Sequence, residues 1–194
     1  MAAKKSWIGL FLLAGCGSAT PIPDCPAPGS PPGNQGTLYY KHNYDFDNSD
    51  GCFKASFPAP PRATQHIVHS ALGTIDQRVF SAATDTNNYL VIMIQLPWLM
   101  GTLAPKAKLI NTAEQQFLDQ EGAKQLSEEK VTVDGYEGKM IRFERKSGDQ
   151  GHAYILPVRH RAYIVVGQST HPSKDVGMDF LHSFKLDRAC IDKL

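Results

Sequence analysis

Apolar and polar residues alternate along much of the chain in a way that predicts β-strands. The most apolar stretch after the N-terminal region is 89–96, which is rich in β-branched residues and ends at Pro97. A continuous apolar run of this length is typical of a strand that is covered on both faces of a sheet. We therefore predict that 89–96 lies at the centre of the sheet.

Shorter segments with alternating or β-branched residues predict further strands, separated by Pro, Gly, Asn or Asp. They are 53–57, 65–70, 74–83, 125–133, 138–145, 152–158 and 162–168. Asp134-Gly135 is a typical two-residue hairpin turn, and Arg159-His160-Arg161 separates the last two segments. The stretch 45–51, rich in Asp and Asn, predicts a turn.

Helical spacing of apolar residues predicts two helices. The first is expected at about 111–121, because Asn111 and Glu114 resemble a capping box and Gly122 is a typical stop. The second is expected at about 173–183. The two apolar faces are Ile110, Ala113, Phe117 and Leu118, and Val176, Phe180, Leu181 and Phe184. This order of elements predicts an α+β fold with a mainly antiparallel sheet flanked by helices.

Four segments resemble the PsbP-like (Mog/PsbP) superfamily over about residues 52–186. They are F-K-A-S-F-P at 53–58, the apolar strand ending at Pro97, D-G-Y-E-G at 134–138 and F-L-H-S-F at 180–184. The resemblance implies an α/β/α sandwich, used mostly as a non-enzymatic binding or assembly module in photosystem accessory subunits, small envelope lipoproteins and secretion-effector chaperones. These segments contain no binding motif of the family, so the resemblance assigns no functional residue.

The N-terminus carries Lys4 and Lys5, a short apolar run at 7–13, and the sequence Leu13-Ala14-Gly15-Cys16. The run is far shorter than the ~20 residues that span a bilayer, and its charged start is typical of a cleaved signal. The segment resembles the lipobox of bacterial lipoproteins, which implies removal of 1–15 and lipidation of Cys16. An ordinary signal peptide, or a retained apolar helix, is the alternative.

A lipoprotein N-terminus carries at least two acyl chains, which is enough for stable anchoring. Gly17 and Ser18 follow the cysteine where an Asp would favour retention in the inner membrane, so the resemblance implies the outer membrane. The lipidated segment 16–36 is rich in Pro and Gly and predicts an extended linker, which could reach up to ~60 Å. A Pro-rich ligand for another protein is the alternative. The remaining segment, 37–194, is predicted to form a single globular domain.

Without Lys4 and Lys5, the 20 basic and 19 acidic residues become 18 and 19, so the mature chain is nearly neutral. No long basic run is present, which argues against a nucleic-acid partner. The densest positive charge in the predicted domain is Arg159-His160-Arg161. We predict that this hairpin tip meets an acidic protein partner or lipid head groups, although solvated hairpin tips often carry such residues.

Lipidation of Cys16 leaves three cysteines, which allow three pairings. Cys52 precedes the first predicted strand and Cys190 follows the last predicted element, so a Cys52–Cys190 disulfide would join the two ends of the domain. Such a bond would contribute roughly 4–5 kcal/mol in the chain-entropy model. Reduced cysteines, or a bond from Cys25 to either of the others or to another molecule, are the alternatives.

The chain lacks the common catalytic motifs G-x-S-x-G, H-E-x-x-H, C-x-x-C, G-x-G-x-x-G and the P-loop. Ser169 and His171 are close in sequence, which is not evidence for a nucleophile and its base. Counting from Asp45, a calcium loop would need Gly and Glu where Asp50 and Ser56 stand. His66 and His69 are expected on opposite faces of one strand. We therefore expect no catalytic residue, no metal site and no cofactor.

These patterns together favour a lipid-anchored, non-catalytic binding or assembly module of the cell envelope, with a protein partner. A narrower alternative is an immunity or secretion-accessory lipoprotein that caps one partner. A third is an envelope hydrolase with a site between sheet and helix.

Overall fold

The computed structural model describes residues 43–70, 73–97, 105–171, 173 and 175–194. The predicted signal at 1–15, the linker at 16–36, the lipidation site Cys16 and the unassigned Cys25 lie outside these residues.

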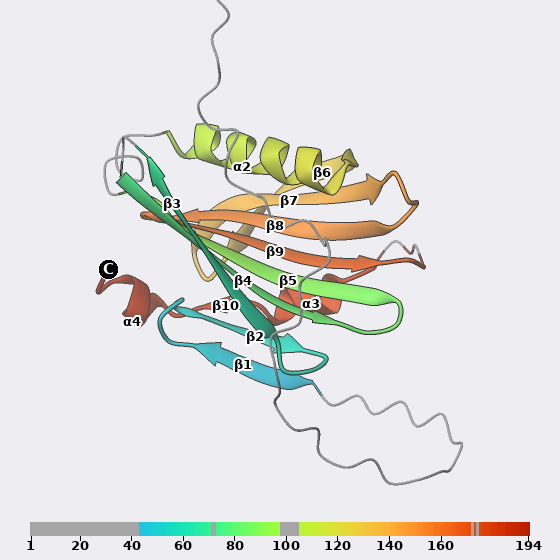
Figure 1. The fold of residues 1–194 in the computed structure, drawn as a ribbon, viewed down its shortest axis with the longest axis horizontal. Helices are drawn as coiled ribbons and strands as arrows, with labels where there is room; N and C mark the ends of the chain where they lie inside the picture. Colours follow the sequence, from blue (N-terminus) through green and yellow to red (C-terminus); the bar gives the residue numbers. More distant parts are fainter. Residues whose placement is uncertain (1–42, 71–72, 98–104, 172, 174) are drawn as a thin grey trace, which may run out of the picture.

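A seven-stranded antiparallel sheet forms the middle layer, with the strand order β3-β4-β5-β9-β8-β7-β6 (Figure 1). Its strands are β3 (Arg62–Ser70), β4 (Gly73–Ala83), β5 (Asn87–Gln95), β6 (Ala123–Val133), β7 (Tyr136–Arg145), β8 (Gln150–Val158) and β9 (Arg161–Ser169). The apolar run predicted for the sheet centre is the interior strand β5. The middle position belongs to its neighbour β9, all of whose residues are buried.

A smaller antiparallel sheet has the order β1-β2-β10, with β1 at Tyr44–Asn48, β2 at Phe53–Phe57 and β10 at Lys185–Leu186. The prediction of a turn over 45–51 was therefore wrong for its first half. Pairs across to β2 explain the difference: Ser56 Oγ donates to Asp45 Oδ1 (2.5 Å), and Lys54 Nζ lies 2.6 Å from Asp47 Oδ2. Such cross-strand pairs outweigh the weak strand propensity of Asp and Asn.

The described helices are α2 (Lys106–Glu121), α3 (Met178–Ser183) and α4 (Arg188–Ile191). Helix α2 begins five residues before the predicted start, because the expected capping box does not form. Its N-cap is Pro105, without a side-chain cap, and the Glu114 side chain pairs with Lys139 on β7 instead. The predicted stop is confirmed, since Gly122 ends the helix in the left-handed conformation (φ 56°).

The predicted helix at 173–183 is confirmed only in its second half. Gly177 has a φ of 75°, which is left-handed and interrupts a right-handed helix, so α3 begins at Met178. The four apolar residues predicted for its buried face are all buried: Val176, Phe180, Leu181 and Phe184.

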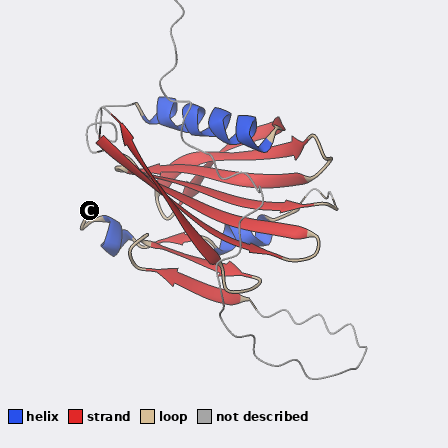
Figure 2. Ribbon diagram, in the orientation of Figure 1, coloured by secondary structure: helices blue, strands red, loops and turns tan. Residues whose placement is uncertain are grey.

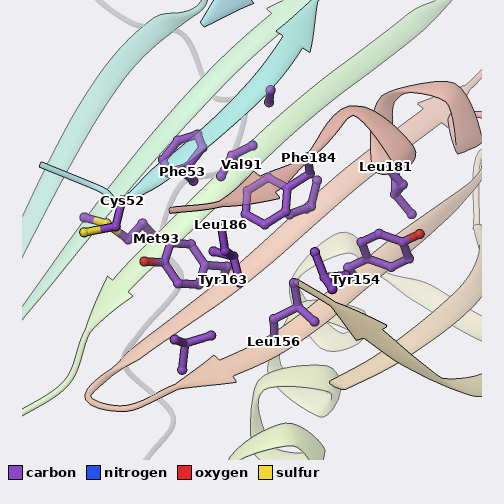
Figure 3. Close-up of a cluster of buried hydrophobic side chains, with 14 of the residues drawn as sticks. Cys52, Phe53, Val91, Met93, Tyr154, Leu156, Tyr163, Leu181, Phe184 and Leu186 are labelled. Carbon is purple, nitrogen blue, oxygen red and sulfur yellow. The ribbon is translucent and has the colours of Figure 1, made fainter. Parts of the chain in front are cut away.

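Each face of the large sheet has its own core. Helix α2 covers one face, and β1, β2, β10, α3 and α4 lie on the other (Figures 1 and 2). The core under α2 is mainly aliphatic, with Ile75, Ile141, Ile155 and Ile164 at its centre. The opposite core is rich in aromatic rings, among them Phe53, Tyr163 and Phe184 (Figure 3). The predicted α+β class with a mainly antiparallel sheet and flanking helices is confirmed.

Candidate functional site

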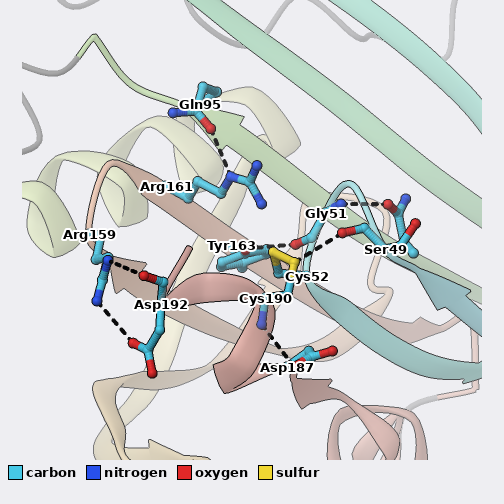
Figure 4. The surroundings of a disulfide bond; sticks show 11 residues. Ser49, Gly51, Cys52, Gln95, Arg159, Arg161, Tyr163, Asp187, Cys190 and Asp192 are labelled. Atoms are coloured by element: carbon cyan, nitrogen blue, oxygen red, sulfur yellow. Dashed lines mark hydrogen bonds and ion pairs between the residues drawn. A yellow bond between two sulfur atoms is a disulfide. The ribbon is translucent and has the colours of Figure 1, made fainter. Parts of the chain in front are cut away.

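The Cys52–Cys190 disulfide joins the segment before β2 to helix α4, across 138 residues and with a Cα–Cα distance of 5.4 Å (Figure 4). The predicted pairing is confirmed. Two hydrogen bonds of Asp187 hold the two half-cystines near each other. Its backbone N–H donates to the Cys52 carbonyl (2.9 Å), and its side chain accepts from the Cys190 N–H (3.1 Å). The bond therefore closes the domain at the point where its two ends already meet.

The hairpin between β8 and β9 carries the three basic residues that the sequence singled out. Its turn has only two residues, because Val158 already pairs with Arg161. Arg159 is exposed and forms an ion pair with Asp192 (2.9 Å), and His160 Nε2 lies 3.4 Å from the Leu194 carbonyl. The charge of Arg159 is thus balanced by the C-terminal segment.

Arg161 differs from the other two residues because it is the first residue of β9 and is 8% exposed. Its Nε donates to Gln95 Oε1 on β5 (2.7 Å), and its Nη1 is buried without a hydrogen-bond partner among the described residues. The structure therefore separates the buried Arg161 from the hairpin tip, where Arg159 is exposed and His160 is half-buried. A role for the three residues in partner binding stays a prediction.

The two edges of the large sheet are built differently. On β6, the pairing with β7 is interrupted by a register shift between Gln125 and Ser127, and four charged residues lie along the strand. They are Lys124, Glu128, Glu129 and Lys130. Bulges and charges are the usual means of protecting an edge strand against further pairing. The β6 edge is therefore blocked.

In the described part of the chain, the β3 edge has no bulge and far fewer charges. It pairs with β4 in continuous register over nine residues, and all side chains that the structure describes on it are exposed, with Ile67 at 55%. Its only formal charge is Arg62, and it contains no Pro. An edge strand of this length and composition can accept another strand.

The hydrogen-bonding pattern shows which residues of β3 face outward. The Thr84 N–H donates to the Asn87 carbonyl (2.8 Å), which fixes the alternation between β4 and β5. Because backbone groups in antiparallel strands point alternately to the two neighbours, the continuous register of β4 leaves one set of N–H and C=O groups on β3 without a strand partner among the described residues. These belong to Ala63, Gln65, Ile67 and His69.

Ser169, His171 and His152, whose side chains are of the types used in catalysis or metal binding, lie within hydrogen-bonding distance of neighbouring groups of the fold. Ser169 Oγ accepts from the backbone N–H of His171 (3.0 Å), while His171 Nδ1 lies 3.2 Å from Thr170 Oγ1. The buried His152 places its Nδ1 2.8 Å from the Val176 carbonyl. Within the described ranges, no group of three or more His, Cys, Asp or Glu side chains lies together as metal ligands would.

None of the helices in the described part of the chain has the length and apolar character needed to cross a bilayer.

Lys139 and Tyr163 are among the ionisable groups whose pKa values are shifted by their surroundings. Burial lowers the pKa of Lys139, but its hydrogen bonds to Glu114 (2.6 Å) and Glu128 (2.8 Å) outweigh burial, so the pKa is raised. Burial raises the pKa of Tyr163, against the opposing effect of the nearby Arg161 guanidinium. The Tyr163 hydroxyl donates to the Gly51 carbonyl (2.8 Å). Lys139 thus connects the large sheet to α2, and Tyr163 connects it to the turn before β2.

Comparison with known proteins assigns the architecture. No protein-family model matches the chain, and no curated protein matches it. Among solved structures, its antiparallel sheet with flanking helices has the PsbP-like fold. It is similar to the solution structure of cyanobacterial PsbP (CyanoP) from Synechocystis sp. PCC 6803, with a TM-score of 0.52 and 14% identity over 79% of this chain and 98% of that chain.

A crystal structure of a Pseudomonas aeruginosa protein of unknown function, PA94, matches with a TM-score of 0.34 and 12% identity, over 61% of this chain and 87% of that chain. No structural argument rests on that match. The similarity to CyanoP supports the fold that the sequence resemblance implied, and at this identity it concerns the fold alone.

Sequence reasoning missed the unprotected edge and the burial of Arg161. The first had a signal, because 62–70 combines strand character with few apolar residues, as an edge strand would. The burial of Arg161 had no sequence signal, because Gln95 and Arg161 are 66 residues apart.

Proposed function

We propose that the protein is a lipid-anchored, non-catalytic binding or assembly module of the cell envelope, and that a protein partner adds an extended segment to the free edge of β3. The observation that carries the proposal is the contrast between the two edges: β6 is protected, whereas β3 presents a long, regular and exposed edge. Backbone hydrogen bonds supply affinity in this mode of binding, and flanking side chains supply specificity.

The side chains of β3 indicate the chemistry of the partner. The strand carries Arg62, His66 and His69 and no acidic residue. Its outward-facing backbone groups accept any extended segment without Pro at the pairing positions. A neutral or acidic strand from another envelope protein is therefore the complementary partner.

The membrane anchor rests on the sequence of the N-terminus, where Leu13-Ala14-Gly15-Cys16 resembles a lipobox. We expect the mature chain to begin at a diacylated Cys16 and to reside in the outer membrane. Mass spectrometry of the protein isolated from its native membrane tests this directly. A Cys16→Ser variant should keep its signal peptide and lose the lipid mass, whereas an unmodified wild-type chain beginning at Met1 would contradict the anchor.

Site-specific photo-crosslinking in intact cells tests the docking edge. A photoreactive amino acid replaces Ile67 on β3, and the matched control carries it at Leu126, an exposed apolar residue on the protected β6 edge (38% exposed). We expect a discrete crosslink to another protein from position 67 and none from position 126.

Three outcomes would contradict the docking proposal: equal crosslinks from both positions, crosslinks only between copies of this chain, or none from position 67. If a partner is captured, its identity also separates a general assembly module from the narrower immunity or secretion-accessory alternative.

A further inference from the structure

A cavity of about 450 Å³ lies beside the disulfide, on the aromatic face of the large sheet. Its wall includes Met93 and both half-cystines, which are apolar, and three basic side chains. The basic residues are Arg78, Arg161 and Lys193. The volume falls within the range of ~300–1,000 Å³ that is typical of small-molecule sites. The cavity therefore combines an apolar wall with cationic groups.

The buried Arg161 is the most unusual group in this wall. More than nine-tenths of the residue is buried, its Nε is used by Gln95, and its Nη1 has no hydrogen-bond partner in the described structure. A guanidinium remains charged at any physiological pH. A buried charge that lacks a counterion is unfavourable unless an anion or other acceptor completes its hydrogen bonds. Arg161 thus has unused capacity to bind an acceptor.

Strand register brings a second arginine to the same face of the sheet. Asp76, Gln95 and Arg161 are neighbours across β4, β5 and β9, and Arg78, Met93 and Tyr163 form the next row on that face. Arg78 is held by Asp76, with Nε 3.1 Å from Oδ2, and its Nη1 is 4.0 Å from Asp50 Oδ2. The acidic residues of the cavity therefore face Arg78, and no carboxylate forms an ion pair with Arg161 within the described part of the chain.

The charges that line the cavity select the kind of anion. Among the side chains that line the cavity, three are basic and two are acidic, Asp50 and Asp76. A carboxylate carries one negative charge at neutral pH, whereas a phosphate monoester carries about two. Arginine also binds carboxylates through two parallel N–H donors. A ligand with one negative charge adds less charge to this lining than a phosphate does, and the guanidinium of Arg161 favours a planar carboxylate.

We propose that this cavity binds a small organic carboxylate, whose carboxylate group is held by Arg161 with support from Arg78 and whose apolar part lies against Met93 and the disulfide. The site does not depend on the docking edge or on the lipid anchor, because its residues come from β4, β5 and β9, the turn between β1 and β2, and the C-terminal segment.

Isothermal titration calorimetry on the full chain tests the proposal. The probes are butyrate, hexanoate and benzoate, with hexanol and inorganic phosphate as comparison ligands. We expect at least one carboxylate to bind with a Kd of about 1 mM or tighter, and hexanol and phosphate to bind at least tenfold more weakly. No carboxylate binding, or stronger binding of phosphate, would overturn the proposal.

Variants locate the binding site. Arg161→Gln keeps a side-chain amide near Gln95 and should weaken carboxylate binding by roughly tenfold or more, because a charge-assisted pair is lost. Arg159→Gln, two residues away on the exposed turn, is the matched control and should bind like the wild type. Circular dichroism verifies folding, and Arg78→Gln, expected to weaken binding less, replaces Arg161→Gln if that variant does not fold. Unchanged binding in the folded arginine variant, or equal loss in Arg159→Gln, would place the ligand elsewhere and refute the site.

Discussion

The two faces of the large sheet are covered by segments of different origin. One face is covered by α2, a continuous helix that follows β5 and precedes β6 in the chain. The other is covered by pieces from both ends of the described domain: β1 and β2 from the start, and α3, β10 and α4 from the end. Packing α2 onto the sheet closes only short loops, because the helix is adjacent in sequence to β5 and β6. Packing segments from the two chain ends together closes a long loop and costs more chain entropy.

The interactions on each face reflect this difference. Helix α2 is held by aliphatic packing and by the Glu114–Lys139–Glu128 network. The cover made from the chain ends has an aromatic cluster, in which Phe53 contacts Phe46, Phe80, Tyr163 and Phe184, and it is closed by the disulfide. The cover made from the chain ends thus has the larger aromatic cluster and a covalent bond, whereas the α2 side has, among the described residues, the single ring pair Phe117–Phe143.

Removal of the disulfide is expected to have the largest effect on stability among the tests of this contrast. We expect the double variant Cys52→Ser/Cys190→Ser to lose roughly 4–5 kcal/mol of unfolding free energy, because the closed loop is long. Chemical denaturation of the oxidised protein and of the variant measures the loss. Reduction should bring the wild type to the stability of the variant and leave the variant unchanged. Equal stability of oxidised wild type and variant would show that the chain ends need no covalent link.

Truncation of one ring on each face compares the two cores directly. Phe53 and Phe117 are both almost fully buried, but Phe117 contacts one ring, Phe143, whereas Phe53 contacts four. We expect Phe53→Ala to cost about 4 kcal/mol and Phe117→Ala about 3 kcal/mol, since each aromatic pair adds to the cost of the cavity. Denaturation midpoints and slopes give both values. A larger loss for Phe117→Ala would reverse the comparison.

The ion network tests what holds the local cover. Glu114 is 7% exposed and accepts from Lys139, so Glu114→Gln should cost about 1–2 kcal/mol, because Glu128 is then the remaining carboxylate partner of Lys139 beside the Asn111 side-chain oxygen. Glu129→Gln changes an exposed carboxyl on β6 and should cost less than about 0.5 kcal/mol. Thermal unfolding of the two variants measures the difference. Similar effects would show that helix packing alone holds α2.

The smallest expected effect concerns Tyr163 and its pH dependence. Tyr163→Phe removes the hydrogen bond to Gly51 and should cost about 1 kcal/mol at neutral pH. Because burial raises the pKa of Tyr163, its contribution is complete below the unfolded pKa of about 10 and is lost as pH rises through the folded value. The wild type should therefore lose more stability than Tyr163→Phe above about pH 10. Lys139, whose pKa is also raised, contributes an alkaline loss common to both proteins. Denaturation at neutral and alkaline pH checks this, and parallel pH profiles would contradict it.

Sequence patterns predicted the elements whose local signals agree with their burial. The run at 89–96 had to be covered because it is apolar on both faces, and Asp134-Gly135 forms the expected hairpin turn with positive φ at both residues (48° and 85°). The disulfide pairing was predictable for a similar reason, since Cys52 and Cys190 flank the predicted elements. In these places, local preference and global structure point the same way.

Features that depend on distant pairing were not predictable. Strand β1 was predicted as a turn because its Asp and Asn side chains favour turns locally, and only pairing with β2 makes it a strand. Arg161 was placed on an exposed tip, whereas pairing of β9 with β5 buries it beside Gln95. Strand β3 differs from these two, because its few apolar residues are a local signal for an edge strand.

The position of the disulfide also decides how the domain would carry mechanical load. Residues 53–189 all lie inside the loop that Cys52 and Cys190 close. Tension applied between the two ends of the domain would peel β1 from β2 and then pass through the sulfur–sulfur bond. The seven-stranded sheet would remain unstretched, so among the described residues the pull would extend those outside the loop, 43–51 and 191–194.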